Sequence, residues 1–115
     1  MSNETVKAIE ANIEKSRKFL DMEHSLSRLR ENKDFKKVII EGYFQQEAIR
    51  LVQLKADPNM QTPQMQAAIL KDIDSIGSLG KYFDTVVAMG QRAKVAIDDG
   101  EEALAEIAAE ELNNV

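Results

Sequence analysis

The chain has one histidine, His24, and an aspartate, Asp21, three residues before it. On a helix this spacing puts a carboxylate and an imidazole on one face, where they can share a metal ion. Helical bundles that bind metal ions in this way use paired Glu-x-x-His motifs together with further glutamates. Because the chain has a single such pair, a metal site would need a symmetric oligomer. We therefore interpret His24 as a surface histidine and predict neither a metal site nor a cofactor.

Other residue patterns that are typical of enzymes do not occur. The serines that could act as nucleophiles would need His24 as their base, and no pattern places it beside them. These serines are Ser25, Ser27, Ser75 and Ser78. Gly77, Gly80 and Gly90 lie in helical sequence, without the preceding strand or the Gly-Lys-Ser/Thr signature of a phosphate-binding loop. We expect that the protein is not an enzyme.

A basic cluster is the candidate nucleic-acid site, because phosphate contacts dominate affinity for DNA. It comprises Arg28, Arg30, Lys33, Lys36 and Lys37. Gly42 stands where a helix-turn-helix would have its turn, but Glu41 occupies a position that should be apolar, and no basic recognition helix follows. At a net charge of -5 the chain is a poor general DNA binder. The cluster can equally be a solvated turn, or a socket for the acidic tail of another subunit.

Composition favours one all-α domain. The 115 residues are rich in helix formers, only 5% are aromatic, and none is cysteine. Neither a disulfide nor a thiolate metal site can form, so nothing argues for an oxidising compartment. No apolar run approaches the ~20 residues of a membrane span, and we expect neither a cleavable signal nor a membrane segment.

Charge is unevenly spread along the chain. Residues 98–115 contain acidic side chains and no lysine or arginine, whereas residues 1–37 have a small excess of basic side chains. This polarity could let one end of a subunit meet the opposite end of its neighbour, or let the acidic end repel DNA. The simpler interpretation is a solvated helix face that ends in an acidic tail.

The elements that carry these residues follow from the spacing of apolar side chains. Three- and four-residue steps predict a helix over about 3–31, with Ser2 or Asn3 as its N-cap. Asn32 tolerates the left-handed conformation that ends helices, and Asp34 is a suitable N-cap for a second helix over 34–56. Gly42 would be packed closely by another helix or mark a kink. The predicted buried side of this second helix is Phe35, Val38, Ile39, Phe44, Ala48, Leu51 and Val52.

A proline turn separates the second helix from a long third one. Asp57-Pro58 ends the second helix because the residue before proline is pushed out of the α region. Thr62 as N-cap with Pro63 at the first helical position predicts the next start. We expect a helix over 63–99 that is straight or bent near Gly80, a break or kink at Asp99-Gly100, and a last helix over 101–112. The predicted fold is an elongated helical hairpin or a bundle of three to four helices.

Heptad spacing along this long helix predicts a seam that packs against a partner. It runs through Ile69, Ile73, Ile76, Gly80, Phe83, Val87, Gly90, Lys94, Ile97, Gly100, Leu104, Ile107 and Glu111. Glycines on such a seam let another backbone approach, or act as hinges. The candidate interface between subunits is Ile69, Ile73, Ile76, Phe83 and Val87, while the second helix holds the hairpin together.

A set of residues between Leu29 and Phe83 carries a family resemblance. They are Leu29, Asn32, Asp34-Phe35, Val38-Ile39, Gly42-Tyr43-Phe44, Glu47-Ala48, Arg50-Leu51, Asp57-Pro58, Ile73, Ile76 and Tyr82-Phe83. With these residues the chain resembles small helical proteins encoded by tailed bacteriophages, often among the virion-assembly genes. The resemblance implies a non-enzymatic component of a phage particle, found in the virion or in the bacterial host cytoplasm. It implies no site residues.

The favoured hypothesis is therefore an oligomeric head, neck or internal protein that pairs with its own copies and with other virion proteins. One alternative is a small DNA-packaging or DNA-binding regulatory protein that uses the basic cluster. Another is a phage protein that binds and inhibits a host factor. The residues do not discriminate the first hypothesis from the last.

Overall fold

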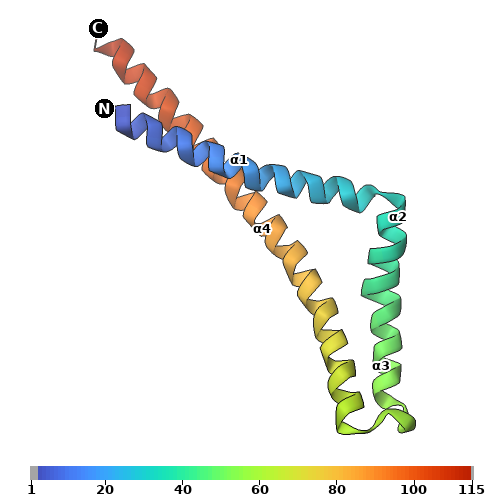
Figure 1. The fold of residues 1–115 in the computed structure, drawn as a ribbon. Helices are drawn as coiled ribbons and strands as arrows, with labels where there is room; N and C mark the ends of the chain where they lie inside the picture. The colour runs from blue at the N-terminus through green and yellow to red at the C-terminus, as the bar shows by residue number, and fades with distance from the viewer. Residues whose placement is uncertain (1–2, 115) are drawn as a thin grey trace. The chain divides into compact units, whose positions relative to one another are not determined.

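The computed structural model describes residues 3–114, and nearly all of them are helical (Figure 1). The elements are α1 (Asn3–Glu31), α2 (Lys33–Phe35), η1 (Lys36–Glu47), α3 (Ala48–Ala56), η2 (Pro58–Met60) and α4 (Pro63–Asn113). The segment η1 is wound as a π-helix, and η2 is a 3-10 turn. No strand occurs within residues 3–114. The all-α prediction, with a long helix after Pro63, is confirmed.

The helices group into two compact units, where chain length predicted one domain. The first unit combines the residues up to Ser25 with those from Val86 onward, and the second unit is Leu26–Thr85. Helices α1 and α4 contribute residues to both units. Each unit has buried apolar side chains of its own.

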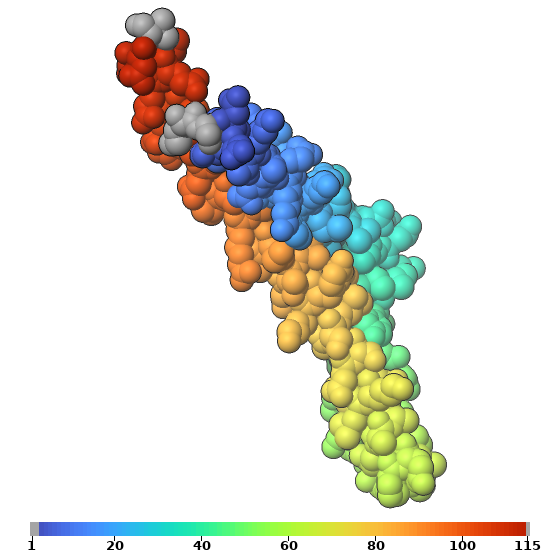
Figure 2. All heavy atoms as spheres, turned by 60° about the vertical axis from the view of Figure 1, so that its left-hand side comes forward, coloured from blue at the N-terminus to red at the C-terminus, as the bar shows by residue number. Residues whose placement is uncertain are grey.

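In the first unit, α1 and the second half of α4 pack closely in an antiparallel pair. Glu23 lies against Gly90 and Ile13 lies against Gly100, so the contacts run in opposite directions along the two helices. A Cβ atom at Gly90 would overlap the Cβ of Glu23, and one at Gly100 would lie 2.8 Å from Ile13 Cγ1. Figure 2 shows the blue side chains of α1 against the orange side chains of α4. Glycine is therefore used here for close approach of two backbones.

The buried stripe of this unit differs from the predicted seam by one residue at two places. The prediction named Val87 and Lys94, whereas the structure buries Val86 and Ala93, with Ile97 as predicted. Small Ala93 fits the narrow gap between the helices, while the Lys94 ammonium stays exposed to water. The stripe on α4 is thus set by steric fit as well as by apolar character.

The second unit is a helical hairpin of η1 and α3 against the first turns of α4. Its core centres on Leu51, which is 1% exposed, together with Ile69 and Ile76. Tyr43, Phe44, Ala48, Leu54, Met60 and Ile73 pack around these three and are partly buried. Leu51 therefore holds α3 to α4, as the sequence predicted.

Two residues predicted on the buried side of this hairpin are exposed. Val38 is 62% exposed and Val52 is 63% exposed. The wide i→i+5 turns of η1 rotate Val38 away from the 3.6-residue register on which the prediction was based. On α3, Leu51 takes the position that faces α4, and its neighbour Val52 is turned outward.

The hairpin turn follows the sequence signals closely. Helix α3 ends at Ala56 before Asp57-Pro58, and α4 begins at Pro63, both as predicted. Thr62 Oγ1 accepts a hydrogen bond from the Met65 backbone N–H at 3.1 Å, which caps the first turn of α4.

Two glutamine side chains close the turn. The side-chain amides of Gln61 and Gln66 each donate a hydrogen bond to the Lys55 carbonyl, both at 3.0 Å. Gln66 donates a second one to the Met60 carbonyl at 2.7 Å. The bonds to Lys55 satisfy a carbonyl group in the last turn of α3, and the bond to Met60 holds the end of η2.

The junction after α1 differs from the prediction. Asn32 is extended, with φ −69° and ψ 126°, and its side-chain oxygen accepts a hydrogen bond from the Phe35 N–H. It is the N-cap of the helix that begins at Lys33, whereas Asp34 was predicted to be the cap. Asn3 is the first described residue of α1, and Ser2, the other predicted N-cap, lies outside the described residues.

A break or kink was predicted at Asp99-Gly100, and the break with a separate last helix is wrong, because α4 continues unbroken to Asn113. A glycine in a helix costs about 1 kcal/mol relative to alanine, which the packing of Ile13 against Gly100 can offset. Gly42 also differs from the prediction of close packing by another helix. A Cβ there would lie 3.1 Å from the Lys37 carbonyl oxygen of the same π-helical segment.

Replacing Leu51 should destabilise the hairpin strongly. Leu51→Ala should lower the free energy of unfolding by about 2–5 kcal/mol, because it leaves a cavity in a fully buried position. The neighbouring Val52→Ala is the matched control and should change it by less than about 0.5 kcal/mol, since Val52 is exposed. Urea unfolding followed by circular dichroism measures both. Equal effects of the two variants would contradict the described core.

Two glycines of α4 should respond to alanine in opposite directions. Gly90→Ala should lower the melting temperature, because the new methyl group overlaps the Glu23 Cβ and pushes α1 away. Gly77→Ala should raise it, since no atom lies within 4 Å of the new methyl group and alanine gains up to about 1 kcal/mol of helix propensity. Thermal unfolding compares them, and a rise for Gly90→Ala would rule out the close approach.

Candidate interaction site

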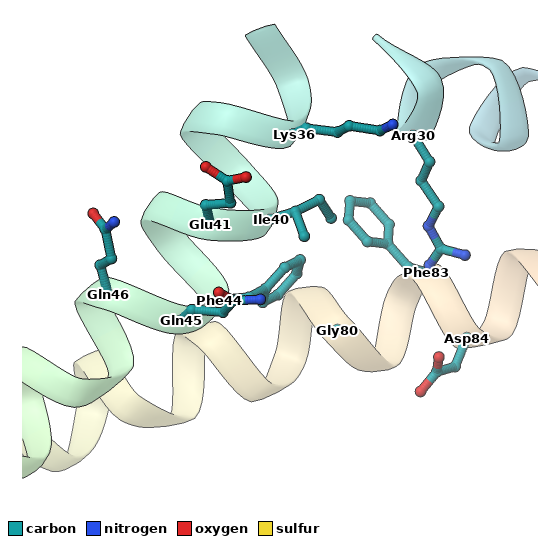
Figure 3. Close-up of a pocket in the computed structure, with 10 residues that line it drawn as sticks. All are labelled: Arg30, Lys36, Ile40, Glu41, Phe44, Gln45, Gln46, Gly80, Phe83 and Asp84. Carbon is teal, nitrogen blue, oxygen red and sulfur yellow. The ribbon is translucent and has the colours of Figure 1, made fainter. Parts of the chain in front are cut away.

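An open hollow of about 740 Å³ lies in the second unit, between η1 and α4 (Figure 3). Its lining residues are Arg30, Lys36, Ile40, Glu41, Phe44, Gln45, Gln46, Gly80, Phe83 and Asp84. Figure 3 shows Phe44 and Phe83 above the α4 backbone near Gly80, with Arg30 reaching Phe83 from α1. Gly80 lies on the α4 side of the hollow, and the Phe44 ring lies 3.7 Å from where its Cβ would be, which is ordinary van der Waals contact.

Aromatic contacts form the floor of the hollow. The Phe83 ring lies 5.8 Å from the Phe44 ring in an edge-to-face arrangement and 6.0 Å from the Phe35 ring. The Arg30 guanidinium stands 5.7 Å from the Phe83 centroid, within the range of a cation–π interaction. Phe83 is only 8% exposed, so it anchors α4 to α1 and η1 within this unit.

The π-helical segment η1 forms the side of the hollow opposite α4. A π segment of twelve residues is unusual, and π-helical turns are frequent at functional sites. Gly42 lies in its middle, where a side chain would press on the Lys37 carbonyl. The lining residues of η1 are Lys36, Ile40, Glu41, Phe44, Gln45 and Gln46. Successive lining residues on the same side of η1 are four or five positions apart, which is the spacing of a π-helix.

Charge divides the rim of the hollow. Arg30 and Lys36 supply the cations, and the Lys36 ammonium lies 3.6 Å from a Glu31 carboxylate oxygen in an exposed ion pair. Glu41 and Asp84 supply the carboxylates, and Figure 3 shows Asp84 pointing away from the Phe44 and Phe83 rings. Exposed pairs of this kind contribute little to stability.

A second ion pair lies beside the hollow on η1 and α3. The Arg50 guanidinium donates a hydrogen bond to the Glu47 carboxylate, which holds the pKa of Glu47 below its ordinary value of 4.5 despite some desolvation. The same bond raises the pKa of Arg50, and Asp72 of α4 adds to this effect. Because the folded pKa of Glu47 is lowered, its small contribution to stability is present above pH 4.5 and is lost as the pH falls through the lowered pKa.

The predicted interface residues lie mostly inside the chain. Ile69, Ile76 and Phe83 are under a tenth exposed, while Ile73 and Val87 are partly buried. Three of these side chains are therefore already covered by the chain's own helices. Their role in an interface between subunits stays a prediction. On α3, the apolar side chains of Ile49 and Val52 are 58% and 63% exposed.

The predicted basic cluster is brought together within the second unit. Arg28, Lys33, Lys36 and Lys37 are exposed, while Arg30 is partly buried over Phe83. The helix continues through Gly42, so no helix-turn-helix turn exists there. Only Arg30 and Lys36 of the cluster line the hollow. Sequence reasoning found these two cations and missed the apolar floor that adjoins them.

The other candidate chemistry has no counterpart among the described residues. His24 is exposed, and within residues 3–114 no three His, Asp or Glu side chains are arranged to hold a metal ion. None of the helices in the described part of the chain is long and apolar enough to cross a bilayer. The hollow combines apolar and charged side chains in the part of the chain that the structure describes.

A double-mutant cycle should detect the contact between Arg30 and Phe83. Arg30→Gln and Phe83→Leu, singly and together, should give a coupling energy of about 0.5–1 kcal/mol, because each removes the same cation–π contact. Urea unfolding supplies the free energies. Arg30→Gln combined with Leu51→Val is the control, and its effects should add. A coupling energy of zero in the first cycle would show that the guanidinium does not stack on the ring.

Comparisons with known proteins identify no relative. No protein-family model matches the chain, and no curated protein and no solved structure matches it significantly. Its function has to follow from the geometry and charge of its own surfaces.

Proposed function

We propose that the protein is a non-enzymatic structural or assembly component of a tailed-phage particle, such as a head, neck or internal protein. It acts as a homo-oligomer through helical surfaces and contacts other virion proteins. The phage assignment is supported by the resemblance carried by residues between Leu29 and Phe83. The mode of action is supported by the exposed apolar side chains of the helices.

The observation that carries this proposal is the number of large apolar side chains left exposed on the helices. They include Met22, Val38, Ile49, Val52 and Val95, each more than half exposed. Apolar side chains exposed singly are normal on a protein surface, whereas a contiguous exposed apolar patch marks a site of protein–protein contact. Ile49 and Val52 stand one turn apart on α3 and share a face that the core around Leu51 does not use.

This α3 face should support self-association. Ile49→Asp with Val52→Asp should lower the weight-average mass in light scattering, because burying two carboxylates in an interface is costly. Helix content in circular dichroism should remain, since both side chains are exposed. Gln53→Asp with Gln64→Asp is the control, because it adds the same charge at exposed polar positions. An unchanged mass in the Ile49/Val52 variant would remove α3 as the interface.

The phage assignment has its own test. Quantitative mass spectrometry of purified particles should find the chain at a fixed ratio to the major capsid protein. Absence from particles, together with co-purification of a host protein, would replace the proposal by the host-factor alternative. Presence only in proportion to packaged DNA would favour the DNA-binding alternative.

A further inference from the structure

One side of the helix pair in the first unit is hollowed along its length. Two open hollows of about 530 Å³ and about 220 Å³ lie there, and Asn12 of α1 and Ala96 of α4 line both of them. They therefore form one shallow groove between the two helices. We call its two edges the groove face. The α1 edge comprises Ala8, Asn12, Lys15 and Phe19, with Met22 one turn further on. The α4 edge comprises Met89, Arg92, Ala96 and Asp99.

The opposite side of the same helix pair is charged. Arg17 of α1 reaches across to Glu101 of α4 in an exposed ion pair of 3.4 Å. Glu10 stands one heptad before Arg17 and continues this charged side. The groove face has uncharged side chains at the equivalent positions, Asn12 and Phe19, which are also one heptad apart. The two sides of the pair therefore present different chemistry.

Apolar side chains meet at the groove. Phe19, Met89 and Ala96 line the smaller hollow together, so they form one contiguous patch. Phe19 is 36% exposed, and Met22, one turn away on the same edge, is 52% exposed. Ala8 is exposed at the other end of this edge. The apolar stripe of α1 thus extends beyond the part that faces α4, which is typical of helices that pack against more than one neighbour.

Opposite charges stand on the two edges at the same height. Lys15 lies on the α1 edge and Asp99 on the α4 edge. Ile13 packs against Gly100 and the helices are antiparallel, so two residues forward on α1 correspond to two residues back on α4. This register brings Lys15 and Asp99 within about 1.5 Å of the same height along the pair, which is the rise of one helical residue. Among residues 3–114 neither of these two side chains forms an ion pair.

We propose that the groove face pairs with the groove face of a second copy, related by a two-fold axis parallel to the helices. Such an axis keeps every residue at its own height and sets α1 of one copy against α4 of the other. Lys15 of each copy then meets Asp99 of the second copy, which gives two ion pairs. Phe19 and Met22 of each copy lie against the side chains around Met89 of the second copy. The four helices form a bundle in which every neighbour is antiparallel.

Symmetry favours a second copy over other occupants. An anionic partner such as duplex DNA would meet the Asp99 carboxylate, and a cationic partner would meet Lys15 and Arg92. A second copy has neither conflict, because the two-fold axis sets Lys15 against Asp99. The same register places Arg92 at a height between Phe19 and Met22 of the second copy, where its guanidinium can lie over the Phe19 ring.

This inference rests on the self-association in the proposed function and adds a contact in the first unit to the α3 face of the second unit. A chain that carries Ile49→Asp with Val52→Asp should therefore stop at a dimer in light scattering, because its groove face still pairs two copies.

A charge-swap experiment tests the pairing. Lys15→Asp and Asp99→Lys, each alone, should raise the apparent dissociation constant about three- to tenfold in sedimentation equilibrium, because like charges then meet at both contacts. An equimolar mixture of the two variants should restore wild-type association, since every contact between the two different chains then joins opposite charges. One chain with both changes should also associate as the wild type does.

A matched pair of apolar variants tests the same face. Met22→Glu puts a carboxylate into the proposed contact and should raise the dissociation constant at least about tenfold. Val95→Glu makes the same kind of change on α4, at a position that is 60% exposed and lines neither hollow, and it should leave association unchanged. Circular dichroism should give the wild-type helix content for both, since both side chains are more than half exposed.

The outcomes separate this inference from the proposed function. A wild-type chain that is monomeric at all concentrations would overturn both. An oligomer that none of the groove-face variants weakens would overturn the pairing alone and leave the proposed function standing. Restored association in the doubly changed chain, without restoration in the mixture, would place Lys15 and Asp99 in contact within one chain and would also overturn the pairing.

Discussion

The structure depends on one constraint: a helix that packs against a single neighbour buries only the stripe that faces it. In the first unit this stripe needs glycine, because Glu23 and Ile13 come so close to Gly90 and Gly100 that a side chain would overlap them. In the second unit Leu51 meets Ile69 and Ile76. Each buried stripe packs against a helix of the same chain. The opposite helix faces still carry apolar side chains, and these stay exposed. The proposed contacts between molecules use those faces.

The same constraint explains what sequence reasoning could and could not find. Local sequence signals that need no tertiary contact predicted the end of α3 at Asp57-Pro58 and the start of α4 at Thr62-Pro63. Both helix boundaries are observed. Periodicity also found Leu51 and the long helix. It could not find that Gly100 is a packing residue and not a helix end, because that depends on Ile13, which lies far away in sequence.

The charged residues of the candidate site could be predicted from the sequence, but the shape of the hollow could not. Arg30 and Lys36 stand out in the sequence, but the hollow beside them depends on π-helical winding that a 3.6-residue period does not indicate. The seam was assigned to partners outside the chain because spacing shows which residues are buried but not what buries them.

The central claim is that the inner stripe packs within one chain and that the outer faces pair between chains. Nuclear magnetic resonance spectra of methyl and aromatic groups over a dilution series test it most directly. The account predicts that the signals of exposed apolar residues of α3, Ile49 and Val52, shift on dilution while those of Leu51, Ile69 and Ile76 stay fixed. Shifts or broadening of the Leu51, Ile69 and Ile76 signals on dilution would show that the core itself forms between molecules, and would contradict the account.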